Sequence, residues 1–133
     1  MFYSSYKEAH EKLGIPGSWQ RGTQGSADLG ITSVKLTANP KSLDRISIDF
    51  KQIYYVGIGK KLSQGQPGAN QREEEQAPFF TSLKNRRPFP VLMKIRTGLI
   101  MYVGDFRVEM IRLQTSPTGI KYYQIHLSNL ESK

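Results

Sequence analysis

The stretch Ile53-Tyr54-Tyr55-Val56-Gly57-Ile58-Gly59 decides which fold class this sequence favours. Its first four residues are β-branched or aromatic, and such side chains pack well on the pleated surface of a strand. The polar run Gln64-Gly65-Gln66-Pro67-Gly68 then indicates a surface loop without regular structure. Because side chains along a strand alternate between its two faces, we expect Tyr54 and Tyr55 to point in opposite directions.

Two strands are predicted before this stretch. Apolar and polar residues alternate in residues 31–36 and again in residues 46–50, which is the pattern of half-buried strands. The run Asn39-Pro40-Lys41-Ser42 lies between them and indicates a turn.

Three more strands are predicted after it, at residues 91–95, 106–113 and 122–127. In the second of these, the apolar positions change parity between Met110 and Ile111, which indicates a bulge. The run Ser116-Pro117-Thr118-Gly119 indicates a hairpin turn between the last two strands.

Two helical segments complete the pattern. Residues 4–13 have apolar residues at helical spacing and are followed by Gly14, and residues 69–85 indicate a helix that is broken or restarted at Pro78. The loop between residues 17 and 30 contains Trp19, which we expect to anchor it in the core. The predicted fold class is α+β, with a small, curved, mainly antiparallel sheet or barrel and one or two short helices.

Length and composition restrict the domain organisation. The chain has 133 residues, of which 38% are hydrophobic, so we expect one core and a single domain over residues 1–133. It contains no cysteine, which excludes disulfides, thiolate metal sites and a cysteine nucleophile, and favours a cytoplasmic location. No apolar run approaches the ~18 residues that span a bilayer, so no membrane association is expected.

Positive charge is concentrated toward the C-terminus. The formal net charge is +8, and residues 84–133 alone carry nine Lys or Arg against three Asp or Glu. A one-sided basic field favours a polyanionic partner, above all nucleic acid, although it also aids solubility. The clustered cations that we predict to contact phosphates are Lys60, Lys61, Lys84, Arg86 and Arg87.

The sequence predicts no catalytic residue, no metal site and no cofactor. His10 and His126 are the only histidines and have no partner at metal-ligand spacing, so we expect His10 on a helix surface and His126 on a strand. Gly59-Lys60 is followed by Lys61-Leu62, which does not match a phosphate-binding loop.

One enzymatic alternative stays open. Tyr55-Val56-Gly57, with Arg72 and the three glutamates at 73–75 downstream, is similar to the strand, arginine and metal-binding glutamate of GIY-YIG nucleases. The upstream strand of that motif is absent, because the corresponding interval reads Leu43-Asp44-Arg45-Ile46-Ser47.

An ordered series of motifs extends over residues 53–127, which is more than half of the chain. Its members are Tyr55-Val56-Gly57-Ile58-Gly59, the polar residues Gln66 and Asn70-Gln71, Ser82, Arg87-Pro88-Phe89-Pro90-Val91, Gly104-Asp105-Phe106-Arg107-Val108 and Gly119-Ile120-Lys121-Tyr122-Tyr123-Gln124-Ile125. In this order the series resembles SRA domains, the SET- and RING-associated modules of the PUA-like superfamily.

The resemblance implies a DNA-binding module that flips a modified cytosine, or another modified base, out of the duplex into an aromatic pocket. By motif position, Tyr55 would be the stacking ring. Gly57 and Gly59 would let the backbone approach the base or the phosphate. Asp44 or Asp49 would accept a hydrogen bond from the cytosine amino group.

The resemblance also implies partners. Duplex DNA is favoured, and a nuclease that is fused or encoded elsewhere would place the module in a restriction or defence system. Since related PUA-like domains suit splayed-out single-stranded bases, RNA is the alternative ligand.

Overall fold

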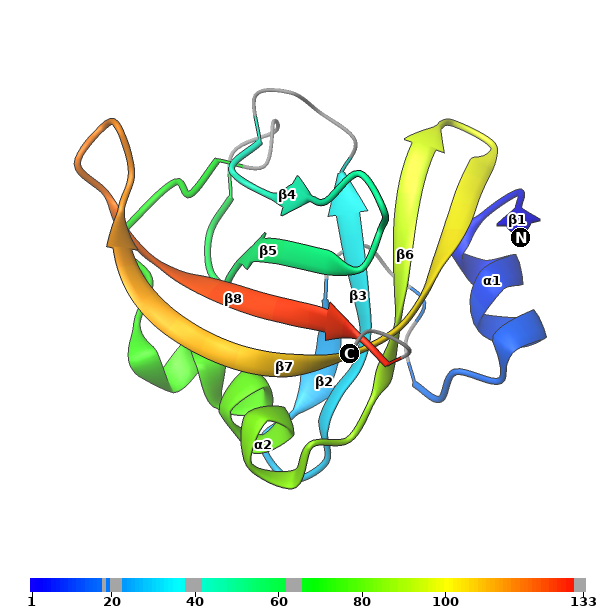
Figure 1. Ribbon diagram of the computed structural model, residues 1–133, viewed down its shortest axis with the longest axis horizontal. Helices are drawn as coiled ribbons and strands as arrows, with labels where there is room; N and C mark the ends of the chain where they lie inside the picture. The colour runs from blue at the N-terminus through cyan, green and yellow to red at the C-terminus, as the bar shows by residue number, and fades with distance from the viewer. Residues whose placement is uncertain (18, 20–22, 38–41, 62–65, 131–133) are drawn as a thin grey trace.

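The structure is a computed structural model that describes residues 1–17, 19, 23–37, 42–61 and 66–130 (Figure 1). Two α-helices, one 3-10 helix and eight strands make up the described part of the chain. In chain order the elements are β1 (Phe2–Tyr3), α1 (Tyr6–Leu13), β2 (Gln24–Ser26), β3 (Gly30–Thr37), β4 (Arg45–Ile46), β5 (Gln52–Val56), the 3-10 helix η1 (Glu73–Gln76), α2 (Ala77–Asn85), β6 (Phe89–Arg96), β7 (Leu99–Thr115) and β8 (Lys121–Asn129).

The strands form one open sheet in the order β2-β3-β6-β7-β8-β5-β4, and β1 pairs with β7. All neighbouring pairs are antiparallel except β3 and β6, which are parallel. The long strands β7 and β8 curve around the core, as Figure 1 shows. The predicted α+β class with a curved, mainly antiparallel sheet is therefore confirmed.

Local sequence signals explain several elements. Ser5 caps the N-terminus of α1 by accepting a hydrogen bond from the Glu8 N–H, and Gly14 ends the helix in the left-handed conformation at φ 67°. The predicted restart at Pro78 is found, because η1 passes into α2 with the proline in the first turn of α2. The predicted hairpin turn between β7 and β8 is also found, with the Ser116 N–H donating to the Ile120 carbonyl.

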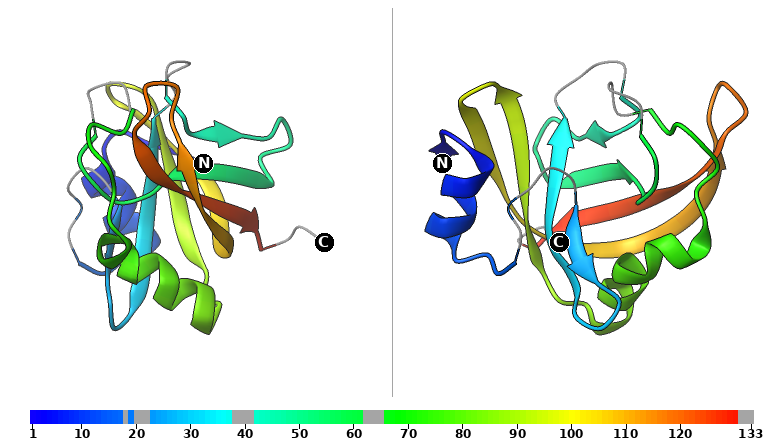
Figure 2. Two further views of the ribbon diagram at one scale, coloured as in Figure 1. Left: turned by 90° about the vertical axis from the view of Figure 1, so that its left-hand side faces the viewer. Right: turned by 180° about the vertical axis from the view of Figure 1, so that it is seen from behind.

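The core lies between the curved sheet and α2. Phe79 of α2 is fully buried against strand residues that include Ile53, Phe106 and Ile125. Helix α1 covers a second, smaller cluster that contains Ala9 and Leu92, and Figure 2 shows α1 and α2 on different sides of the molecule. No helix among the described residues is long and apolar enough to cross a membrane.

The position of α1 overturns two predictions. Strand β3 is not half-buried, because Ser33 and Lys35 on its second face are buried beneath α1. His10 is not on a helix surface either: it is 4% exposed, and its Nε2 lies 3.2 Å from the Ser33 Oγ and 3.2 Å from the Lys35 Nζ. Burial lowers the pKa of Lys35 to about 8.

Three further predictions differ from the structure. The strand at residues 46–50 ends at Ile46, because the Ser47 hydroxyl bonds the Asp49 carboxylate and receives the Gln52 N–H in a turn. Trp19 does not anchor the core and is 49% exposed. The bulge in β7 lies between Val108 and Met110, slightly before its predicted place. The turn predicted at residues 39–42 falls mostly outside the described residues.

Candidate functional site

Tyr54 and Tyr55 point to opposite faces of β5, as alternation requires. Tyr54 is 40% exposed and stacks on the ring of His126 across the β5–β8 pair, with 4.7 Å between ring centroids. Tyr55 faces inward and is 3% exposed, and its ring lies 6.0 Å from that of Phe79. The Tyr55 hydroxyl accepts a hydrogen bond of 2.6 Å from the Thr23 hydroxyl.

Asp44 lies at the end of β5, beside Tyr55. Its carboxylate accepts a hydrogen bond of 2.8 Å from the Val56 N–H. Burial raises the pKa of Asp44, while the positive charge of Lys61 and the Val56 N–H act in the opposite direction. The short β4–β5 hairpin, in which Arg45 pairs with Tyr54, brings this carboxylate to the strand end.

Asp49, the other predicted acid, lies elsewhere. It is exposed in the turn between β4 and β5, where the Ser47 hydroxyl and the Lys51 N–H donate to its carboxylate. These two hydrogen bonds lower the pKa of Asp49. The structure therefore brings Asp44, and not Asp49, next to Tyr55.

The ammonium group of Lys61 lies over the Tyr55 ring. Its Nζ is 4.2 Å from the ring centroid, and it donates hydrogen bonds of 3.2 Å to the Tyr55 hydroxyl and 3.0 Å to the Val56 carbonyl. Lys60, its neighbour, is exposed. We call the group formed by Thr23, Asp44, Tyr55, Val56 and Lys61 the Tyr55 site.

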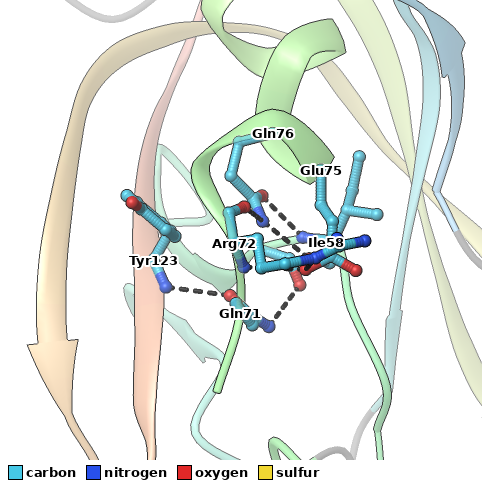
Figure 3. A network of polar contacts seen from close by, with 7 residues as sticks. Ile58, Gln71, Arg72, Glu75, Gln76 and Tyr123 are labelled. Carbon is cyan, nitrogen blue, oxygen red and sulfur yellow. Dashed lines mark hydrogen bonds and ion pairs between the residues drawn. The ribbon is translucent and has the colours of Figure 1, made fainter. Parts of the chain in front are cut away.

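Two glutamines hold the chain that leaves this site (Figure 3). The Gln76 side chain accepts a hydrogen bond from the Ile58 N–H and donates to the Ile58 carbonyl, at 2.7 and 2.6 Å. The Gln71 side chain donates to the Gly57 carbonyl and accepts from the Tyr123 N–H, each at 2.8 Å. The end of β5 is thereby fixed to η1 and to β8.

Gly57 and Gly59 leave room for these glutamines. A Cβ atom on Gly57 would lie 2.4 Å from the Gln76 Oε1, and one on Gly59 would lie 2.9 Å from the Gln71 Cγ. From the sequence, the two glycines are instead predicted to let a base or a phosphate approach the backbone. In the structure, the space beside both is occupied by protein side chains.

Comparison with known proteins decides the fold. No protein-family model matches the sequence, and no curated protein matches it significantly. Among solved structures, the chain is similar to KRYPTONITE in complex with mCHH DNA, an H3(1-15) peptide and SAH, with a TM-score of 0.76 and 17% identity over 100% of this chain and 32% of that one. It is similar to the modification-dependent TagI restriction endonuclease, with a TM-score of 0.78 and 19% identity over 99% of this chain and 49% of that one. It is also similar to the SUVH5 SRA complex with hemi-methylated CG DNA, with a TM-score of 0.74 and 20% identity over 98% and 86% of the two chains.

The chain has the SRA fold. It spans about a third of the KRYPTONITE chain and about half of the TagI chain. The resemblance that the ordered motifs indicated is thus confirmed at the level of the fold.

Within the SRA fold, the predicted cations do not form one cluster. Lys84, Arg86 and Arg87 are exposed at the end of α2, where Arg86 lies 3.5 Å from the Glu109 carboxylate. Figure 1 shows this end of α2 at the bottom of the molecule, whereas the chain after β5, which carries Lys60, lies in its upper part. Phosphate contact by these cations stays a prediction, but the structure does not place all of them around the Tyr55 site.

The residues of the nuclease alternative have structural partners. Arg72 is exposed, donates its N–H to the Glu75 carboxylate and forms an ion pair of 3.8 Å with it. In the part of the chain that the structure describes, no group of three His, Asp or Glu side chains is placed to hold a metal ion.

The glutamines of Figure 3 are the residues that sequence reasoning missed. Gln71 was part of the SRA-like series without an assigned role, and Gln76 had none. The available signal was an uncharged amide directly after three glutamates, four residues beyond Arg72. Only the fold shows that this amide faces a strand end.

We predict that Gln76→Ala destabilises the SRA fold by about 2–4 kcal/mol, because the partly buried Ile58 N–H and carbonyl lose the partner that the fully buried Gln76 side chain supplies. Urea unfolding monitored by circular dichroism measures this. Glu74→Ala, on the exposed side of the same turn, should change the free energy of unfolding by less than about 0.5 kcal/mol. Equal effects of the two substitutions would show that the glutamine contacts contribute little.

Proposed function

We propose that this chain is a DNA-binding module that recognises modified cytosine, or another modified base, by receiving the base at the Tyr55 site after it has rotated out of the duplex. One observation carries the proposal: the half-buried carboxylate of Asp44 lies beside an inward-facing aromatic ring at the end of β5. An aromatic ring binds any base by stacking, and a carboxylate accepts a hydrogen bond from the exocyclic amino group of cytosine.

The structural neighbours support the same ligand class. Solved SUVH5 SRA structures contain hemi-methylated CG DNA and fully hydroxymethylated CG DNA. The net charge of +8 suits a polyanion. TagI is a modification-dependent restriction endonuclease, and this chain spans about half of it. We therefore propose that the module acts in restriction or defence, with the nuclease activity supplied by another domain or subunit.

A binding panel tests the proposal. Gel shifts are measured at one fixed salt concentration with duplexes carrying one central cytosine, methylcytosine or hydroxymethylcytosine, with the matching single strands, and with RNA, each with and without Mg²⁺. We expect the affinity for one modified duplex to be at least about tenfold higher than for the plain duplex, because one wrong base pair in a site usually lowers affinity by about this factor. No strand should be cut.

Equal binding of the modified and plain duplexes would overturn the proposal, and so would either of two further results. Tighter binding of RNA than of every duplex would favour an RNA-binding PUA-like module. Mg²⁺-dependent cutting that Arg72→Ala abolishes would favour the nuclease.

A further inference from the structure

Lys61 occupies the ring face that a stacked base needs. Its ammonium lies 4.2 Å from the Tyr55 ring centroid, and Tyr55 is only 3% exposed. Phe79 contacts the same ring from the core and is itself fully buried. A base can therefore stack on Tyr55 only if a side chain is displaced, and Lys61 belongs to the surface segment after β5 rather than to the core.

The backbone of Lys60 and Lys61 is held by Pro67 and Gly68, so the Lys61 side chain can leave the ring while these backbone contacts stay in place. Lys61 forms an isolated antiparallel bridge with Pro67, and the Gly68 N–H donates to the Lys60 carbonyl at 2.8 Å. Rotation about side-chain bonds is thus sufficient to move the ammonium from the ring toward solvent, on a timescale far shorter than that of loop unfolding.

The contacts of the ammonium match those of a base that carries an amino group. Lys61 covers the ring, donates to the Val56 carbonyl at 3.0 Å and faces the negative charge of Asp44. A stacked cytosine would cover the same ring and direct its amino group to these acceptors. A base with a carbonyl at that position, such as thymine, would instead direct an acceptor toward the Val56 carbonyl and the Asp44 carboxylate and would give neither of them a new donor.

From this placement we propose that Lys61 determines specificity by occupying the base site of the free protein as an internal competitor. The inference rests on the proposed function and adds a condition to it. A flipped base enters only if it replaces all the contacts that the ammonium gives up. The apparent affinity for every flipped base is reduced by the fraction of molecules in which Lys61 is seated, and removing the competitor restores that affinity.

Two roles of Lys61, as a competitor of the base and as the phosphate contact predicted from sequence, predict opposite effects of Lys61→Ala. If Lys61 competes with the base, Lys61→Ala should tighten binding of the modified duplex by about tenfold, in line with the strength of a partly desolvated cation–π contact. If Lys61 instead contacts phosphate, the same substitution should weaken binding of all duplexes alike and reduce the salt dependence.

The experiment compares three variants by titration with modified and plain duplexes that carry 2-aminopurine beside the target base. Lys61→Ala should tighten modified-duplex binding, and its fluorescence should also rise with the plain duplex, because flipping no longer requires displacement. Lys61→Arg restores a cation over the ring and should behave as the wild type. Lys60→Ala is the matched control and should weaken both duplexes equally, as the loss of an exposed cation does.

A measurement on the free protein tests whether the Lys61 ammonium lies over the Tyr55 ring. In the proton NMR spectrum of the free protein, the ε-methylene protons of Lys61 should be shifted upfield by the Tyr55 ring, those of Lys60 should not, and Tyr55→Leu should remove the shift. Absence of the shift, or a Lys61→Ala variant that binds no more tightly than the wild type, overturns the inference. Wild-type protein that binds modified and plain duplexes equally, with the shift present, instead overturns the proposed function.

Discussion

Replacing Tyr55 by leucine should remove most of the preference for a modified duplex and leave general DNA binding in place. Stacking of a base on an aromatic ring is worth about 1–3 kcal/mol, so the modified duplex should bind roughly 5- to 150-fold more weakly. Contacts to phosphates do not depend on this ring, so binding of the plain duplex should change little. Binding titrations of both duplexes at the same salt concentration measure the two effects.

Leucine is chosen because Tyr55 is also a core residue. The ring is buried among Ile53, Phe79 and their neighbours, and truncation to alanine would leave a cavity that destabilises the fold by about 3–5 kcal/mol. Tyr55→Phe retains the stacking face and loses only the hydroxyl that accepts from Thr23 and Lys61, so its effect on base preference should be mild.

Tyr54→Leu is the matched control, because Tyr54 lies one residue away on the opposite face of β5 and stacks on His126. It should retain the preference for the modified duplex. If Tyr54→Leu loses the preference and Tyr55→Leu keeps it, the base binds on the outer face of the sheet, and the Tyr55 site is not the recognition site.

The strands and helices that the sequence predicts well are those with local causes. A restart at Pro78 follows from the backbone of proline, and the turn ending at Gly119 follows from a left-handed φ of 85° that glycine adopts readily. Residues 46–50 alternate like a strand, but Ser47 and Asp49 satisfy backbone N–H groups with their own side chains. Such local polar contacts compete with strand pairing, and the alternation alone does not reveal them.

Features that arise from packing between distant elements could not be predicted from the sequence. His10 and Lys35 are buried because α1 lies on the second face of β3, which depends on how the whole sheet is covered. Parallel pairing of β3 with β6 likewise joins segments that are separated by the rest of the core. Alternation of apolar and polar residues identifies one buried face of a strand, and it cannot show that the polar face is buried as well.

The candidate site, too, was predictable from the sequence only in part. Alternation along the strand predicted that Tyr54 and Tyr55 face opposite sides, and the position of Tyr55 in the series Tyr55-Val56-Gly57-Ile58-Gly59 made it the expected stacking ring. Which of the two tyrosines faces the core is shown only by the structure. The sequence did not separate Asp44 from Asp49, because both are acidic residues that precede the strand. The hairpin between β4 and β5 separates them by placing one carboxylate against Val56 and the other in an exposed turn.

Asp44→Asn should therefore change base preference, whereas Asp49→Asn should not. An asparagine oxygen can still accept from the Val56 N–H, so the local structure is kept, but the negative charge that favours a cytosine amino group is lost. Hydrogen bonds to charged groups contribute about 1.5–3 kcal/mol, so the modified-cytosine duplex should bind roughly 10- to 150-fold more weakly. Asp49 is exposed and bonded within its own turn, so Asp49→Asn should leave the preference intact.

The pH dependence distinguishes a recognition role of Asp44 from a structural one. Burial raises the pKa of Asp44, so in the folded protein the ionised form is disfavoured and the free energy of unfolding should increase as pH falls through that pKa. Binding should change in the opposite direction, because protonated Asp44 is a poorer acceptor for the amino group and affinity for the modified duplex is lost over the same pH range. Asp44→Asn should abolish both effects. Paired measurements of denaturant unfolding and of duplex binding across the acid range test this, and a wild-type affinity that is unchanged while stability shifts would show that Asp44 supports the hairpin and does not contact the base.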